Sequence, residues 1–87
     1  IQEGSIVMHD VLINSGVKIS SNVVINTKAL IEHDVIIGEN SHISTGVIIN
    51  GNVKIGKNCF VGSGSVIKEN LKISDNTFIK MGSIIKK

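Results

Sequence analysis

Apolar and polar positions repeat along this chain with a period of six residues. A β-branched aliphatic residue occupies every sixth position from Ile1 to Ile85, fifteen times without exception. Three residues after each comes a turn column, in which thirteen of fourteen residues are Gly, Asn or Asp and the remaining one is Lys28. Gly, Asn and Asp accept the left-handed backbone of a tight turn more readily than other residues do. The pattern therefore predicts a short strand and a turn in each hexapeptide.

This period favours a parallel β-helix. An α-helix cannot use a repeat of six, and each Gly in it would cost about 1 kcal/mol. With a turn after every hexapeptide, three hexapeptides form one coil of a triangular prism, and the 87 residues form slightly under five coils. Successive coils would stack as parallel strands about 4.8 Å apart. We predict an all-β fold, a single hexapeptide-repeat β-helix domain spanning residues 1–87.

Each hexapeptide orients its side chains in a fixed order. The large aliphatic residue and the small residue two before it point inward, and the residue between them points outward. Residues eighteen apart share a face or an edge of the prism. The Ile6 face carries Ile6, Val24, His42, Phe60 and Phe78; the Leu12 face carries Leu12, Leu30, Ile48, Val66 and Ile84; the Lys18 face carries Lys18, Ile36, Lys54 and Lys72. The His33 edge carries Ser15, His33, Gly51 and Glu69, and the Thr27 edge carries Thr27, Thr45, Ser63 and Met81.

Two of the three faces are apolar, which predicts buried contacts between copies of the chain. Turning the uniformly apolar Leu12 face toward a rotation axis gives a closed trimer. The His33 edge of one subunit then meets the Thr27 edge of its neighbour. An outer groove runs between them, walled by the neighbour's Ile6 face and by the Lys18 face. A second packing, with the Thr27 edge on the axis, would bury both apolar faces, and the sequence alone does not exclude it.

Composition argues against several functions. A net charge of +2 and only two aromatic residues disfavour nucleic-acid binding. No apolar run approaches the roughly 18 residues that cross a bilayer, and the first residues lack the pattern of a signal peptide. The single cysteine, Cys59, falls in the inward column, so we expect a core residue in a reducing compartment. We expect a cytoplasmic protein without membrane or nucleic-acid partners.

The candidate chemistry lies within residues 31–51. His33 and Asp34 share a corner, His42 follows nine residues after His33, and Gly51 stands one coil beyond His33. A polar residue at a corner and an Asp in the turn column are ordinary here, so the pattern alone leaves surface and catalytic roles open. His42 is less ordinary, because ten of the other thirteen residues in its outward column are apolar and three are lysines. Its position favours a subunit contact or the lining of the groove.

The three histidines do not predict a metal site. His9, His33 and His42 lie on different edges or faces, so one chain cannot gather them around an ion. Combining His33 with a neighbour's His42 would still leave a third ligand missing. We therefore expect no metal, and we interpret His9 as a surface residue.

The same residues resemble a known family. The runs Asn26-Thr27, Ile31-Glu32-His33-Asp34, Ile37-Gly38-Glu39, Ser41-His42, Gly46 and Gly51-Asn52-Val53-Lys54-Ile55-Gly56 are similar to the left-handed β-helix domain of the sialic-acid O-acetyltransferase-like family. That family includes bacterial UDP-4-amino-sugar N-acetyltransferases. The resemblance covers essentially all 87 residues. It implies left-handed coils, a homotrimer, and acetyl transfer from acetyl-CoA to a nucleotide-linked amino sugar.

The resemblance also implies roles for individual residues. By matching position, His33 would be the general base, and Asp34 would raise its basicity and fix its tautomer. His42 of the adjacent subunit and the amide of Gly51 would contact the thioester of acetyl-CoA. Ser63 and Met81 would line the CoA channel, although the family is often Gly-rich where this chain has Lys80-Met81-Gly82.

Other functions are compatible with the same fold. Family members carry an N-terminal nucleotide-binding domain that is absent from this sequence, which begins at Ile1, so we expect residues 1–87 to be the C-terminal part of a longer acetyltransferase. A sugar O-acetyltransferase and a non-catalytic β-helix trimerisation module are the alternatives. The γ-class carbonic anhydrases share the fold but need a third histidine in the right place.

Overall fold

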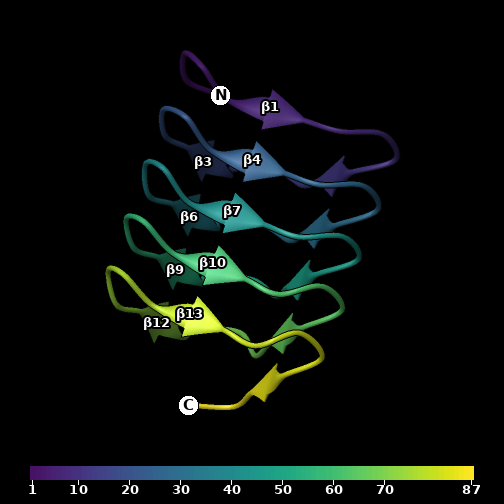
Figure 1. The fold of residues 1–87 in the computed structure, drawn as a ribbon, viewed down its shortest axis with the longest axis vertical. Helices are drawn as coiled ribbons and strands as arrows, with labels where there is room; N and C mark the ends of the chain where they lie inside the picture. The colour runs from purple at the N-terminus through teal and green to yellow at the C-terminus, as the bar shows by residue number, and fades with distance from the viewer.

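The computed structural model describes all 87 residues as a parallel β-helix, and it confirms the predicted fold class. Followed in Figure 1 from the purple N-terminus to the yellow C-terminus, the chain descends in left-handed coils, and the two termini lie at opposite ends of the prism. Fourteen strands of two residues each alternate with turns, and no helix is present. The chain therefore holds no helix of the length and apolarity needed to cross a bilayer.

The strands form three parallel sheets, one behind each predicted face. The sheet of the Ile6 face contains β1 (Ile6–Val7), β4 (Val24–Ile25), β7 (His42–Ile43), β10 (Phe60–Val61) and β13 (Phe78–Ile79). The sheet of the Leu12 face contains β2 (Leu12–Ile13), β5 (Leu30–Ile31), β8 (Ile48–Ile49), β11 (Val66–Ile67) and β14 (Ile84–Ile85). The sheet of the Lys18 face contains β3 (Lys18–Ile19), β6 (Ile36–Ile37), β9 (Lys54–Ile55) and β12 (Lys72–Ile73).

The register of these sheets is eighteen residues throughout. Val24 pairs with His42, which in turn pairs with Phe60. Every residue of the turn column has a positive φ, including Lys28 at 62°. Lys28 therefore adopts the same turn as the Gly, Asn and Asp residues, because the pairing of the coils on either side sets the backbone there.

The core lies along the prism axis and consists of the two inward columns. Its aliphatic column includes Ile25, Ile31 and Ile37, all fully buried. Polar residues in the inward columns are satisfied by the backbone, since Ser41 donates its Oγ–H to the Gly56 carbonyl at 2.8 Å. Cys59 is 2% exposed, as its column predicts. Because the inward columns alone form the core, the outward side chains remain available for other roles.

Candidate active site

The backbone of the neighbouring coils fixes the corner that carries His33 and Asp34. This corner connects β5 to β6, and Asp34 occupies its left-handed position with φ of 58°. The N–H of Asp34 donates to the Ser15 carbonyl of the preceding coil at 3.0 Å. The carbonyl of His33 accepts the N–H of Asn52 from the following coil, also at 3.0 Å. Hydrogen bonds on both sides therefore hold the corner in place.

The His33 and Asp34 side chains form a hydrogen-bonded pair. Nδ1 of His33 lies 3.2 Å from Oδ2 of Asp34. A carboxylate only accepts hydrogen bonds, so the pairing places the imidazole proton on Nδ1 and leaves the lone pair on Nε2 when the ring is neutral. The two side chains are 55% and 61% exposed, so a reactant can reach them. This is the arrangement that a histidine general base requires.

The imidazole of His33 lies over Gly51. A methyl group added to Gly51 would come within 2.7 Å of Cε1 of His33, and Nε2 would be its nearest neighbour. Gly51 is itself buried beneath the ring. The structure thus brings His33, Asp34 and Gly51 together, with the free nitrogen of the imidazole next to the one residue of this edge that lacks a side chain.

Some features of this corner belong to the repeat in general. A methyl group on Gly16 would contact the Asp34 carboxylate, but Asn22 lies over Gly4 in the same way. The N–H of Gly51 has no acceptor within the chain, and the same holds for most corner residues. The feature specific to the site is therefore an imidazole above a glycine.

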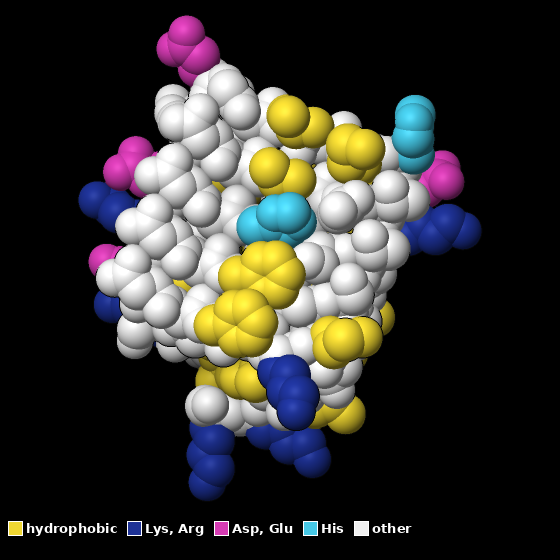
Figure 2. All heavy atoms as spheres, in the orientation of Figure 1, with side chains coloured by type: hydrophobic (Ala, Val, Ile, Leu, Met, Phe, Trp, Pro, Cys, Tyr) yellow, Lys and Arg dark blue, Asp and Glu magenta, His cyan; other side chains and the backbone are white.

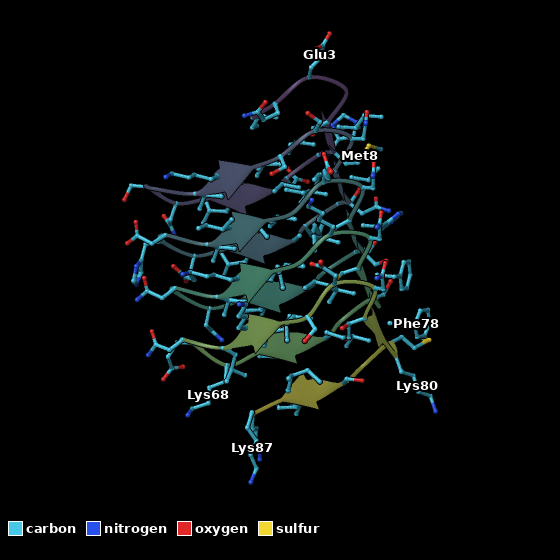
Figure 3. The ribbon with its side chains drawn as sticks, turned by 90° about the vertical axis from the view of Figure 1, so that its left-hand side faces the viewer. Glu3, Met8, Lys68, Phe78, Lys80 and Lys87 are labelled. Atoms are coloured by element: carbon cyan, nitrogen blue, oxygen red, sulfur yellow. The ribbon has the colours of Figure 1, made fainter.

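His42 lies away from this corner, at the centre of the Ile6 face. It is half-buried on β7, and its ring centroid is 5.2 Å from that of Phe60. Phe60 stacks in turn on Phe78 at 5.1 Å, with an angle of 10° between the rings. Figure 2 shows this face as a column of apolar side chains interrupted by one imidazole. In Figure 3, Phe78 of this face and Lys68 lie on opposite sides of the prism. Lys68 is the residue before Glu69, which belongs to the His33 edge.

Ser63 and Met81 lie on the Thr27 edge. They are exposed and occupy successive coils, and the N–H of Gly82 donates to the Ser63 carbonyl at 2.8 Å. The whole Leu12 face separates this edge from the His33 edge. One chain therefore brings together three of the six predicted site residues, and it places His42, Ser63 and Met81 elsewhere on its surface.

Comparisons with known proteins agree with this architecture. Residues 34–69 match the family model described as bacterial transferase hexapeptide (six repeats), and residues 52–87 match the hexapeptide repeat of succinyl-transferase. Each match covers less than half of the chain, and together they identify the hexapeptide repeat in residues 34–87. No curated protein matches it in sequence.

One solved structure with the same fold is the acetyltransferase domain of PglB from Neisseria gonorrhoeae FA1090. The TM-score is 0.81 at 23% sequence identity, and the match covers 95% of this hexapeptide-repeat chain. It covers 46% of the PglB domain chain, so the present chain spans about half the length of that structure.

The titratable residues of this chain form no cluster of metal ligands. No three His, Cys, Asp or Glu side chains come together within the chain. His9 is exposed on the Thr27 edge, one coil before Thr27. The donor set of a single chain therefore offers no metal centre.

Sequence reasoning missed one group of polar residues beside the site. A shallow hollow of about 370 Å³ adjoins Asp34 on the Lys18 face. Its lining consists of Asp34, Asn52, Lys54, Asn70, Leu71 and Lys72. The sequence carries a signal for this hollow, since Lys54 and Lys72 follow each other on one face, but the repeat pattern by itself predicts only a groove wall there.

Proposed function

We propose that this chain is the acetyl-CoA-dependent acetyltransferase domain of an enzyme that N-acetylates a nucleotide-linked amino sugar, and that it works as a homotrimer. The observation that carries the proposal is the His33 imidazole, hydrogen-bonded to Asp34 through Nδ1 and lying over Gly51. The match to transferase hexapeptide repeats supports acyl transfer as the reaction class. The fold shared with the acetyltransferase domain of PglB is consistent with acetyl as the acyl group.

His33 would act as the general base. The amine nitrogen attacks the thioester carbonyl, a C–N bond forms, and the proton of the amine passes to Nε2 of His33. Collapse of the tetrahedral intermediate breaks the C–S bond, and the imidazolium returns the proton to the sulfur of the departing CoA. A positioned base of this kind contributes about 10²–10⁴-fold to the rate. Asp34 keeps the proton on Nδ1 and stabilises the imidazolium.

Gly51 would give the thioester access to the site. Because it has no side chain, the carbonyl of acetyl-CoA can approach the backbone beside His33. Its N–H has no acceptor within the chain, so it is free to donate to the developing oxyanion. One such donor is worth about 10²–10³-fold.

The homotrimer would supply the rest of the site. Leu12, Phe78 and Ile84 are 59%, 71% and 66% exposed in the single chain, which is unusual for large apolar side chains on two of three faces. Burying the Leu12 face at a three-fold axis would place the neighbour's His42 near the thioester. Ser63 and Met81 of that neighbour would line the path of CoA. In this arrangement each active site is shared by two subunits.

The test of this mechanism is His33→Ala in the complete protein, with His9→Ala as the matched surface control. The assay follows release of CoA thiol from acetyl-CoA in the presence of UDP-linked 4-amino sugars, and the one cysteine of residues 1–87, Cys59, is buried and contributes little background. We expect kcat to fall at least about 100-fold in His33→Ala and to stay near wild type in His9→Ala. CoA binding should be nearly unchanged in both. Normal turnover in His33→Ala would overturn the general-base role.

A binding measurement separates the enzyme from a non-catalytic trimerisation module. Acetyl-CoA at a hundred times its dissociation constant should stabilise the folded protein by about 2.7 kcal/mol, seen as a rise in the thermal transition. Native mass spectrometry should give a trimer. No stabilisation at millimolar acetyl-CoA would favour the module, and turnover with hydroxyl sugars alone would favour O-acetylation.

A further inference from the structure

Two lysines of the Lys18 face form an unneutralised pair. Lys72 of β12 pairs directly with Lys54 of β9, and both side chains are exposed. The chain contains only two ion pairs, one between His33 and Asp34 and one between Lys57 and Glu39. No carboxylate therefore lies within 4 Å of either ammonium group. Like charges placed directly opposite each other on neighbouring strands are destabilising, so a bound anion would offset an existing repulsion.

The surroundings of this lysine pair are suited to an anion. Shallow hollows lie on both sides of the pair, and both lysines line each of them together with a single acidic residue, Asp75 in one hollow and Asp34 in the other. The hollow toward the His33 edge is also lined by Asn52 and Asn70, whose carboxamides can donate hydrogen bonds. Lys18, on the same face, pairs with Ile36 and has no lysine next to it. The paired charge is therefore confined to the third and fourth strands of this sheet.

The pair also lies next to the candidate base. Asp34 lines the same hollow as Lys54 and Lys72, and Asp34 is hydrogen-bonded to His33. An anionic group held by the lysines would thus lie on the Asp34 side of the candidate base. Two ammonium groups on adjacent coils, whose backbones are about 4.8 Å apart, match an anion with two linked charged centres better than a single carboxylate.

We propose that Lys54 and Lys72 form a subsite for the diphosphate group of a substrate of the reaction at His33. This inference rests on the proposed function, since both substrates of that reaction, acetyl-CoA and a nucleotide-linked sugar, carry a diphosphate. The shared chemistry is recognition of two adjacent phosphates by two lysine ammonium groups and neighbouring carboxamides. The experiments below distinguish which substrate supplies it.

The direct test is a titration of the complete protein with inorganic pyrophosphate, UDP and CoA, each followed by calorimetry. We expect Lys54→Met and Lys72→Met each to raise the pyrophosphate dissociation constant about three- to tenfold, and the double variant to raise it further. Lys18→Met removes the same charge from the same face and should leave binding unchanged. Weakening of UDP alone would identify the nucleotide-linked acceptor as the source of the diphosphate, and weakening of CoA alone would identify the cosubstrate. Unchanged pyrophosphate binding in the double variant would overturn the proposal.

A kinetic test keeps this proposal separate from the proposed function. In an active enzyme the double variant should raise the KM of one substrate at least about tenfold while kcat changes much less, because the lysines bind and do not react. The titrations need no turnover. Lysine-dependent pyrophosphate binding in a protein without transferase activity would therefore preserve the anion subsite while the catalytic function fails. Activity with an unchanged KM for both substrates would reject the subsite and leave the catalytic function intact.

Discussion

The His33 edge and the edge that carries Glu3, Ser21, Glu39, Lys57 and Asp75, here called the Glu39 edge, have the same backbone and different chemistry. The turn residues Asp34 and Asn40 have φ of 58° and 62°. The carbonyls of His33 and Glu39 each accept an N–H from the next coil at 3.0 Å. Beneath Glu39, however, stands Lys57, whose Nζ lies 3.7 Å from the Glu39 carboxylate. Beneath His33 stands Gly51.

This difference shows how a uniform scaffold acquires a site. On the Glu39 edge successive residues interact with one another: the ammonium group of Lys57 pairs with Glu39, and the backbone N–H of Lys57 donates to Oδ1 of Asp75 at 2.8 Å. On the His33 edge the side chain that would occupy the imidazole's place is missing, and the ring settles into the space. The candidate site therefore differs from the scaffold by one histidine and one absent side chain, with no change in the main chain.

The largest effect should come from making the His33 edge resemble the Glu39 edge with Gly51→Lys. Gly51 does not have a positive φ, so the backbone accepts a side chain, but its first carbon would displace the imidazole. We expect turnover to fall about 10²–10⁴-fold, as far as if the base were lost. The thermal transition should change little, because the displaced group is an exposed side chain. Ser21→Lys, on the Glu39 edge, is the control, and equal activity of both variants would contradict the role of the glycine.

A smaller effect should follow from Asp34→Asn, measured by steady-state kinetics. Asparagine accepts the left-handed turn, so stability should be preserved. The neutral amide neither stabilises an imidazolium nor fixes the proton on Nδ1, and such supporting residues typically contribute about 10–100-fold. Asp10→Asn alters the same turn column at the same φ of 58° and should be silent. Equal losses in the two variants would point to a turn effect instead of a catalytic one.

The smallest effect should come from Lys57→Met, which breaks the ion pair of the Glu39 edge. The two partners are 61% and 48% exposed, and exposed pairs contribute less than about 1 kcal/mol. Chemical denaturation should show a change of that size or none, with turnover unaltered. A large loss of stability or of turnover would mean that the Glu39 edge has a role beyond the scaffold.

Much of the molecule could be predicted because the repeat assigns one direction to each position. The period of six predicts the three faces, the burial of Cys59 and the stacking of Gly51 on His33, and the structure has all of these. The position of an imidazole ring could not be predicted in the same way. Whether the His33 ring turns toward Gly51 or into solvent depends on its rotamer, and a column pattern carries no information on rotamers.

Lys28 and the Leu12 face show two other limits of the sequence pattern. Lys28 takes the left-handed turn against its own preference, because hydrogen bonds such as the one from its N–H to the His9 carbonyl, at 3.1 Å, impose it. The orientation of the Leu12 face in an assembly depends on the surface of another copy. A single chain contains no contact that chooses between the two trimer packings.

The register of eighteen residues has a consequence for how such a site can change. Adding one hexapeptide between His33 and Gly51 would rotate all later residues by a third of a revolution and bring a different edge beneath the imidazole. Adding three hexapeptides would restore the angular phase, so that Gly51 stays on the His33 edge but lies one coil further along the axis. The angular position of a residue thus depends on its place within the eighteen-residue register, and its height along the axis depends on the number of coils before it. A domain of this kind can grow by whole coils while every edge keeps its identity.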